Sequence, residues 1–239
     1  MANDKKGLDT NSNTYTIVYS ALLVIVVAFL LAFVFQTLKP LQDDNVKLDK
    51  KKQILAALNL RNLADQDAYE KYKEMVVADE IIDAKGTVTA PGAQGGENDG
   101  FRLNSADMKQ GHLALYVCKV DGQTKYVIPV YGMGLWGAIS GYIAIDEDKE
   151  TVFGAYFNHE SETAGLGAEI KDDTSWQESF RGKKLFGEGG REIALAVVKK
   201  KDNEATQVDA ITGATLTSDG VTAMLRDCLG AYLTFLTDK

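Results

Sequence analysis

Cysteine and histidine are scarce in this chain of 239 residues, which has two of each: Cys118, Cys228, His112 and His159. An iron–sulfur cluster needs about four thiolates, so the chain alone cannot hold one. The same inventory argues against a tetrahedral structural zinc site. Both cysteines lie in apolar segments, which favours two buried free thiols over a disulfide or a redox pair. Redox chemistry in this chain would therefore need an organic cofactor.

Proline and positive charge are also low. The chain has three prolines, and its formal net charge is −8. Lys and Arg supply most of the affinity of proteins for phosphate backbones. An acidic chain without a basic stripe is therefore a poor nucleic-acid binder, and we do not expect nucleic acid as a partner.

The longest apolar run is Ile17–Phe35, which contains no charged residue. As a helix rising about 1.5 Å per residue it would span roughly 28 Å, close to the hydrocarbon thickness of a bilayer. The alternative is a cleaved signal peptide, whose apolar stretch is about 7–15 residues and precedes a small-residue cleavage site. Because this run is longer and no such site follows, we predict a retained transmembrane helix over residues 15–38, after a short tail at residues 1–14.

The lysines around this run do not fix its orientation. Two lysines precede it and five follow it within the next segment. The positive-inside rule taken literally would place the large domain in the cytoplasm, but long domains translocate largely regardless of flanking charge. The charge pattern therefore leaves the side of the membrane open.

Beyond the membrane run the pattern changes from helix to strand. Residues 41–85 are charged and partly amphipathic, with Asp44–Asn45 as a possible cap, which predicts a solvated helical stalk. A glycine-rich segment at residues 89–100 follows it as a loop. We therefore assign residues 39–100 to a helical stalk and loop, and residues 101–239 to a globular domain.

Alternating and apolar runs predict a sheet in the globular domain. The expected strands are residues 113–120, 125–131, 138–145, 152–157 and 193–198. An amphipathic helix from about Ser218 to Leu236, with Thr217 or Ser218 as its N-cap, closes the chain. Strands followed by a closing helix indicate an α+β fold with a twisted, largely antiparallel sheet.

The segment that most suggests chemistry is Asp209–Ser218, directly before the closing helix. Four hydroxyl side chains fall in one turn: Thr212, Thr215, Thr217 and Ser218. A helix N-terminus offers unpaired N–H groups and the positive end of the macrodipole, which suits a phosphate. Turns rich in Ser and Thr are more often simple caps, so the pattern alone leaves both interpretations open.

The run T-G-A-T, within D-A-I-T-G-A-T-L-T-S, resembles the attachment motif of a covalent-FMN domain family. This family occurs in Na⁺-translocating NADH:quinone reductase and in the related Rnf electron-transport complexes. In it the last threonine of the tetrad carries FMN through a phosphoester, so the resemblance implies attachment at Thr215. It also implies that Thr212, Gly213 and Ala214 hold the phosphate turn.

Two further stretches are similar to flavin-contacting motifs of the same family. H-E-S-E-T-A-G-L-G at residues 159–167 is similar to H-x-E-T-P-G-L-G, and residues 132–137 match G-x-G-L-W. The residues implied to approach or line the flavin are Leu135, Trp136, Glu162, Thr163, Gly165 and Leu166. The chain departs from the pattern at Ala164, which replaces Pro, and by one extra residue between His159 and Glu162. That leaves the path of the loop open, and a structural role is favoured for His159.

A third stretch, Leu38–Leu55, resembles the post-membrane segment of the NqrC branch of this family, from the sodium-pumping reductase. The RnfG branch lacks a close copy of it. The resemblance covers nearly the whole chain. It implies an FMN-carrying relay of electrons from NADH toward ubiquinone in a complex that exports Na⁺. It further implies the bacterial inner membrane, a periplasmic flavin domain, partner subunits, and a flavin transferase that uses FAD.

The residues around Thr215 do not suggest catalysis by the chain itself. A threonine hydroxyl needs an adjacent base to act as a nucleophile, and the nearest carboxylate in sequence is Asp209. Asp209 is expected to order the turn, and we assign no catalytic residue. No G-x-G-x-x-G fingerprint marks a nicotinamide site, and the membrane run has no ionisable residue for sodium passage. The chain is therefore expected to be inactive alone.

Three alternatives stay open from the residues alone. The first is an Rnf-type electron-transport subunit. The second is a membrane-anchored domain that binds FMN or another anion reversibly. The third is a stalk or assembly subunit that carries no cofactor.

Overall fold

The computed structural model describes residue 10, residues 12–190 and residues 192–238. The chain divides into two compact units, of which the first ends at Lys47 and the second begins at Leu48. Helix α1 (Asn13–Ala57) passes through this division. The four segments predicted from the sequence were divided by their expected role, whereas these two units are divided by compactness. The boundaries of the four segments therefore stay a prediction.

The first unit contains the apolar run. Among the described residues, α1 is the one helix that is long and apolar enough to cross a membrane. The large apolar side chains of Ile17–Phe35 are exposed within the chain, as expected for a helix that needs apolar surroundings. The expected helix start at Asp44–Asn45 is wrong, because α1 continues through this point and contains Pro40. The residues after Pro40 include many strong helix formers, which favour continuation.

The second unit is built on a six-stranded antiparallel sheet in the order β2-β1-β3-β4-β5-β6. The strands are β1 (Val76–Ile82), β2 (Val88–Ala90), β3 (Leu113–Val120), β4 (Gln123–Met133), β5 (Ala138–Asp146) and β6 (Val152–His159). The four strands expected between residues 113 and 157 are confirmed. A separate parallel pair joins β7 (Ala196–Val198) to β8 (Gln207–Asp209). The expected strand at 193–198 is thus shorter than predicted, and β8 was not predicted.

Strand β1 lies where the sequence favours part of a helical stalk, and that expectation is wrong. The segment begins and ends with β-branched residues, which favour a strand. The acidic residues of this segment suggest a solvated helix, but Asp79 is buried. The Asp79 carboxylate accepts backbone N–H groups of Ala93 (3.0 Å), Asp99 (3.0 Å) and Phe101 (3.3 Å). The charge therefore orders the following loop instead of facing water.

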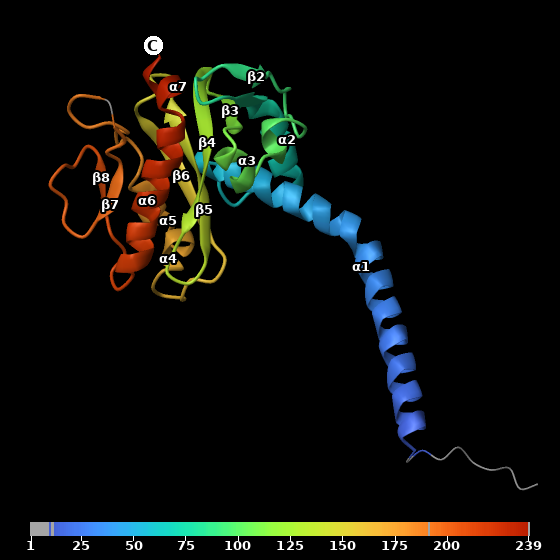
Figure 1. The fold of residues 1–239 in the computed structure, drawn as a ribbon. Helices are drawn as coiled ribbons and strands as arrows, with labels where there is room; N and C mark the ends of the chain where they lie inside the picture. The colour runs from blue at the N-terminus through green and yellow to red at the C-terminus, as the bar shows by residue number, and fades with distance from the viewer. Residues whose placement is uncertain (1–9, 11, 191, 239) are drawn as a thin grey trace, which may run out of the picture. The chain divides into compact units, whose positions relative to one another are not determined.

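Helices cover both faces of this sheet (Figure 1). On one face lie α5 (Thr174–Glu178), α6 (Thr215–Ala231) and α7 (Leu233–Thr237); on the other lie the last turns of α1 and α2 (Asp65–Met75). Short helices complete the unit: η1 (Gly100–Arg102), α3 (Ser105–Lys109) and α4 (Glu169–Asp172). Successive side chains of a strand point to opposite faces of the sheet, so the two faces carry two separate hydrophobic cores. Leu113 and Leu115 of β3 pack toward α6, whereas Ala114 and Tyr116 pack toward α1 and α2. The predicted α+β fold is confirmed.

The closing helix begins earlier than predicted, at Thr215, with Ala214 as its N-cap. The predicted caps, Thr217 and Ser218, are wrong because both are buried inside the first turn. The Ser218 hydroxyl accepts the backbone N–H of Ile211 (3.2 Å), so it holds the preceding segment instead of its own helix. This shift places Thr215 at the first position of α6.

Strands β3 and β4 separate at Pro129, and α6 and the residue that follows it fill the opening. The ladder of these two strands ends at the pair of Tyr116 with Val127, and the same register would next bond Ala114 to Pro129. Proline has no N–H to donate. Instead, the hydroxyl of Tyr232, directly after α6, donates to the Ala114 carbonyl (2.7 Å).

Two residues after Pro129, Cys228 of α6 hydrogen-bonds to the backbone of β4 at Tyr131. The Tyr131 N–H donates to the Cys228 sulfur and the Cys228 thiol donates to the Tyr131 carbonyl, both at 3.3 Å. Cys118 and Cys228 are both buried, as predicted. The opened sheet therefore fixes α6 along β4, and with it the position of Thr215.

Replacing Tyr232 by Phe should weaken the fold. The change removes one hydroxyl and leaves the buried Ala114 carbonyl without its donor, which costs about 1–2 kcal/mol in the free energy of unfolding. Urea denaturation of the full chain in detergent measures this loss. Tyr126→Phe, at a half-exposed tyrosine on β4, is the control and should change stability by less than about 0.5 kcal/mol. Equal stability of the Tyr232→Phe variant and the wild type would contradict this account.

Candidate functional site

Thr215 stands at the start of α6 and is half-buried. The turn before it is tight: Gly213 has a φ of +78°, which favours glycine, and the Ala214 N–H donates to the Ile211 carbonyl (3.0 Å). Within the described chain no side chain caps α6. The first N–H groups of the helix are therefore left for another acceptor, and together with the macrodipole they suit a phosphate.

The four hydroxyls expected at this turn have different surroundings. Thr217 is buried and donates to a Glu162 carboxylate oxygen (2.7 Å), and Ser218 is buried against Ile211. Thr212 is exposed, and Thr215 is partly exposed. The structure thus leaves two of the four hydroxyls, Thr212 and Thr215, open to a group that arrives from solvent.

Glu162 joins three segments that are distant in sequence. One carboxylate oxygen accepts from the Thr217 hydroxyl, and the other accepts from the N–H groups of Trp136 (2.8 Å) and Gly137 (3.4 Å). Only 8% of Glu162 is exposed. Burial raises the pKa of this carboxyl, but the three hydrogen bonds and nearby His159 together lower it further, so the net pKa lies below its usual value. Glu162 therefore stays charged at neutral pH.

Two glycines allow Glu162 to come this close. A Cβ added at Gly134 would lie 2.5 Å from one Glu162 carboxylate oxygen. A Cβ at Gly167 would lie 2.3 Å from the other oxygen and 2.6 Å from the Thr217 hydroxyl. All three distances are shorter than real contacts, so the glycines of the G-x-G-L-W and G-L-G patterns allow this carboxylate to approach.

The loop with the extra residue closes as a turn. The Glu162 N–H donates to His159 Nδ1 (3.2 Å). Ser161 packs against the β4–β5 hairpin, since a Cβ at Gly137 would lie 2.1 Å from the Ser161 hydroxyl. The extra residue is accommodated between His159 and Glu162 without separating Glu162 from the hairpin. His159 thus has the kind of structural contact that is favoured for it from the sequence.

Apolar side chains surround the start of α6. Eight large apolar side chains are exposed among the described residues of the second unit. Four of them lie on the segments that Glu162 connects: Leu135, Trp136, Leu166 and Leu216. Trp136 is 66% exposed and Leu216 is 59% exposed. Leu166 reaches Gly213, where an added Cβ would lie 2.8 Å from its side chain. We call these four residues the apolar rim. Exposed apolar side chains that gather in one patch often mark a binding site.

The turn that presents Leu166 contains the remaining predicted flavin residues. The Thr163 carbonyl accepts the N–H groups of Leu166 and Ala168, both at 3.1 Å. Gly165 has a φ of +73°, which this tight turn requires and which favours glycine. Thr163 and Gly165 therefore shape the loop beside the rim.

Two lysines near the turn at residues 211–214 were not predicted from the sequence. Because β7 and β8 are parallel, and the Ala210 N–H donates to the Val198 carbonyl (2.8 Å), the residues after β7 lie at the same edge as this turn. Lys199 and Lys200 are exposed there and make no ion pair among the residues that the structure describes. The parallel pairing of these two short strands brings the lysines to the turn, and the sequence pattern does not reveal it.

Asp209, expected to order the turn, contacts its neighbours on both sides. Its carboxylate pairs with Lys201 (3.0 Å), and its carbonyl accepts the indole N–H of Trp176 (2.8 Å). These contacts hold the end of β8 against α5 and the loop after β7.

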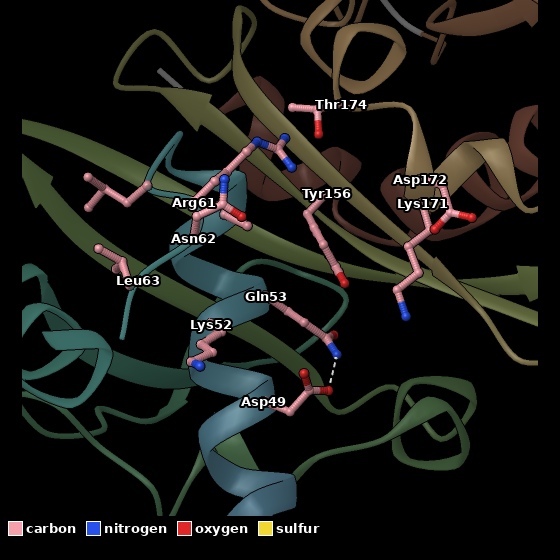
Figure 2. A pocket seen from close by; sticks show the side chains of 12 residues that line it. Asp49, Lys52, Gln53, Arg61, Asn62, Leu63, Tyr156, Lys171, Asp172 and Thr174 are labelled. Atoms are coloured by element: carbon pink, nitrogen blue, oxygen red, sulfur yellow. Dashed lines mark hydrogen bonds between the residues drawn. The ribbon is translucent and has the colours of Figure 1, made fainter. Parts of the chain in front are cut away.

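A separate pocket of about 450 Å³ lies between the end of α1 and the α4–α5 segment (Figure 2). None of the predicted flavin residues lines it. Much of its polar lining is already engaged: Gln53 donates to Asp49 (2.6 Å), Lys52 pairs with Asp65 (2.6 Å), and Arg61 donates to neutral acceptors on β6 and α5. We assign no cofactor to this pocket.

Comparison with known proteins identifies the family. Residues 134–230 match the family model described as FMN-binding domain, a range that contains every predicted flavin residue. The NqrC subunit of the Na⁺-translocating NADH-quinone reductase of Haemophilus ducreyi is 36% identical over 232 residues, which cover 91% of this chain and 89% of that protein. The chain belongs to the NqrC family.

Other members of the NqrC family agree in sequence and fold. The NqrC of Neisseria meningitidis serogroup B is 30% identical over 233 residues, covering 90% of this chain and 89% of that protein. The crystal structure of NqrC from Parabacteroides distasonis has a TM-score of 0.76 and 37% identity, and covers 84% of this chain and 98% of that one. NqrC from Shewanella oneidensis has a TM-score of 0.63 and 26% identity, covering 80% and 97%. The family resemblance predicted from the motifs is confirmed.

Replacing Glu162 by Gln should lower stability at neutral pH, because hydrogen bonds to a charged acceptor contribute about 1.5–3 kcal/mol each. The folded-state pKa of Glu162 is depressed, so its contribution is complete above the unfolded pKa of about 4.3 and is lost as the pH falls through the lower folded value. The difference in unfolding free energy between wild type and variant should therefore shrink from pH 7 to pH 3.

Urea denaturation at each pH measures this difference. Glu160→Gln, at an exposed glutamate of the same loop, is the matched control and should show a small difference that does not depend on pH. A Glu162→Gln difference that stays constant from pH 7 to pH 3 would show that the carboxylate does not hold these segments.

Proposed function

We propose that Thr215 carries FMN through a phosphoester and that the chain relays electrons within a Na⁺-translocating NADH-quinone reductase. The position of Thr215 supports this most strongly: it is a partly exposed hydroxyl at the first residue of a helix that no side chain of the described chain caps. The match of residues 134–230 to an FMN-binding domain supports FMN as the cofactor.

The residues around Thr215 fit the two parts of FMN. Thr212, Gly213 and Ala214 shape the turn at the phosphate, where the first N–H groups of α6 lack acceptors. Leu135, Trp136 and Leu166 offer apolar surface to a planar ring, and Glu162 fixes the hairpin and the loop that carry them. The bound flavin would supply redox chemistry in steps of one or two electrons, while the protein supplies position and electrostatics.

Thr215 is modified by another protein in this proposal. A flavin transferase would use FAD as donor. The bond between the two phosphates of FAD would break, the Thr215 oxygen would bond to the flavin-side phosphorus, and the leaving AMP would take up the Thr215 proton. Thr217 cannot compete for this transfer, because it is buried and its proton is donated to Glu162.

The names of the relatives support an electron relay within a larger complex. They are subunits of reductases named for NADH, quinone and Na⁺ translocation. In our proposal electrons pass from NADH toward ubiquinone through several subunits while the complex exports Na⁺, and this chain is one carrier among them. NADH oxidation and sodium passage belong to partner subunits.

Thr215→Ala should abolish covalent flavin. Expressed with the transferase, the wild-type chain should remain fluorescent in a denaturing gel and carry an added mass of roughly 440 Da, localised to Thr215 by peptide fragmentation. Thr212→Ser, which keeps a hydroxyl at the other exposed position, should retain the label. Fluorescence in the Thr215→Ala variant would refute the attachment site. Flavin lost on denaturation of the wild type would instead indicate reversible binding, and an unmodified mass would indicate a cofactor-free subunit.

We further propose that α1 anchors the chain in the bacterial inner membrane as a single span, with the second unit in the periplasm. The apolar run of α1 and membership in the NqrC family support the anchor. The lysines after the run oppose this orientation only weakly, since long domains cross regardless of flanking charge.

An impermeant thiol reagent tests the orientation in intact cells. Both native cysteines are buried, so a cysteine placed at exposed Ala84 in the turn between β1 and β2 should be the site of labelling. Ala84→Cys should react before cell lysis, and the wild type should stay unlabelled. Labelling of Ala84→Cys that requires lysis would place the second unit in the cytoplasm.

A further inference from the structure

Three lysines in a row follow β7, and they differ in their partners. Lys201 is partly buried and pairs with both Asp209 and Glu204, each at 3.0 Å. Lys199 and Lys200 are exposed, and in the described part of the chain neither of them forms an ion pair. Two unpaired positive charges therefore lie near the start of α6, in a chain whose formal net charge is −8.

The contacts of α6 fix the direction in which β7 runs. Midway along α6, the Thr222 hydroxyl accepts the N–H of Val197 and donates to the Val197 carbonyl, both at 2.9 Å. Near the start of α6, the Ser218 hydroxyl accepts the N–H of Ile211, which follows the end of β8 (3.2 Å). Strand β8 therefore runs toward the N-terminus of α6, and β7, which is parallel to β8, runs the same way.

This direction carries the two lysines to the level of Thr215. Thr222 follows Thr215 by seven residues, which is about 10 Å along a helix. Lys199 and Lys200 follow Val197 by two and three residues, which is up to about 7 and 10 Å along the chain. A lysine carries its charge at the end of a flexible four-carbon stem. Both ammonium groups can therefore reach the surface beside the partly exposed Thr215 hydroxyl.

The phosphate of a flavin is the anion that suits this position. In the proposed function the phosphodiester on Thr215 keeps a negative charge, and the diphosphate of the FAD donor is also an anion. The first N–H groups of α6 supply only the partial charge of the helix dipole. Lysine binds phosphate as a full point charge. Asp219, exposed four residues after Thr215, has the opposite sign, but the two lysines outweigh it.

We propose that Lys199 and Lys200 bind the flavin phosphate, first as the diphosphate of FAD during transfer and then as the phosphodiester on Thr215. They are positioning residues, because the oxygen that forms the bond belongs to Thr215 and the lysines exchange no proton in the transfer. The proposal rests on the proposed attachment of FMN. It extends that attachment to a second segment, outside the T-G-A-T motif, that orients the phosphate.

Trace acetylation of lysines tests the contact in the loaded chain without the transferase present. The full chain in detergent is compared after expression with and without the transferase, and mass spectrometry reads the label on each lysine. An anion beside an ammonium group keeps it protonated, whereas only the neutral amine reacts. Flavin loading should therefore slow the acetylation of Lys199 and Lys200 at least about threefold. Lys119, exposed on β3, is the control and should react equally in both samples.

Salt separates a phosphate contact from simple cover by the flavin ring. Slowing caused by the phosphate charge should largely disappear in about 1 M salt, where the screening length is about 3 Å. Slowing that persists in this salt, or equal acetylation of the loaded and unloaded chains, would overturn the proposal. A chain that carries no flavin on Thr215 after expression with the transferase would instead refute the proposed function, so the two failures are distinguishable.

Charge variants test the effect on flavin transfer. With purified transferase and FAD at low salt, the double variant Lys199→Gln/Lys200→Gln should lower kcat/KM for the chain about tenfold. Lys199→Arg/Lys200→Arg keeps both charges and should retain most of the wild-type rate. Lys85→Gln/Lys119→Gln removes two exposed charges elsewhere and should match the wild type. A wild-type rate in the first variant, or an equal loss in the arginine variant, would show that these two charges do not bind the phosphate.

Discussion

The carboxylate of Glu162 is the contact on which the candidate site depends. It is buried, and a buried charge is tolerated only when hydrogen bonds compensate for lost hydration. Its three donors come from the β4–β5 hairpin and the first turn of α6, so satisfying one charge fixes three segments relative to one another. The same contact turns Thr217 inward. Thr215, two residues earlier on the helix, is then left at the surface between the hairpin and the loop of Leu166.

The placement of α6 has its own cause, in the missing N–H of Pro129. Because β3 cannot continue its ladder there, Ala114 and Tyr131 take their hydrogen bonds from Tyr232 and Cys228 at the far end of the closing helix. These bonds hold the C-terminal half of α6, and Glu162 holds its first turn. Contacts at both ends of α6 therefore fix the position of its N-terminus. A site for a bound phosphate would require such a fixed position.

The sequence predicts the elements whose pattern is local and misses those decided by distant partners. Strands β3 to β6 follow from apolar runs separated by turn residues. Strand β1 escapes prediction because Asp79 looks like a surface residue, although it is buried and bonded to a loop. The predicted start of α6 is misplaced because Thr217 and Ser218 resemble caps. Their partners, Glu162 and Ile211, cannot be read from spacing, since Thr217 and Glu162 are 55 residues apart. The site residues came from family resemblance, while their mutual contacts came from the structure.

The shape of the site gives a physical reason for the proposed covalent attachment of the flavin. The pocket in Figure 2 does not include Thr215, and the side chains of the apolar rim beside Thr215 are 41–66% exposed. Reversible cofactors are usually held in concave sites that bury most of their surface. A ring held on an open rim buries less and would be retained weakly, because association also costs translational and rotational freedom. The proposed phosphoester to Thr215 would remove that cost. It would keep the flavin on a surface open enough for electrons to pass to a neighbouring protein.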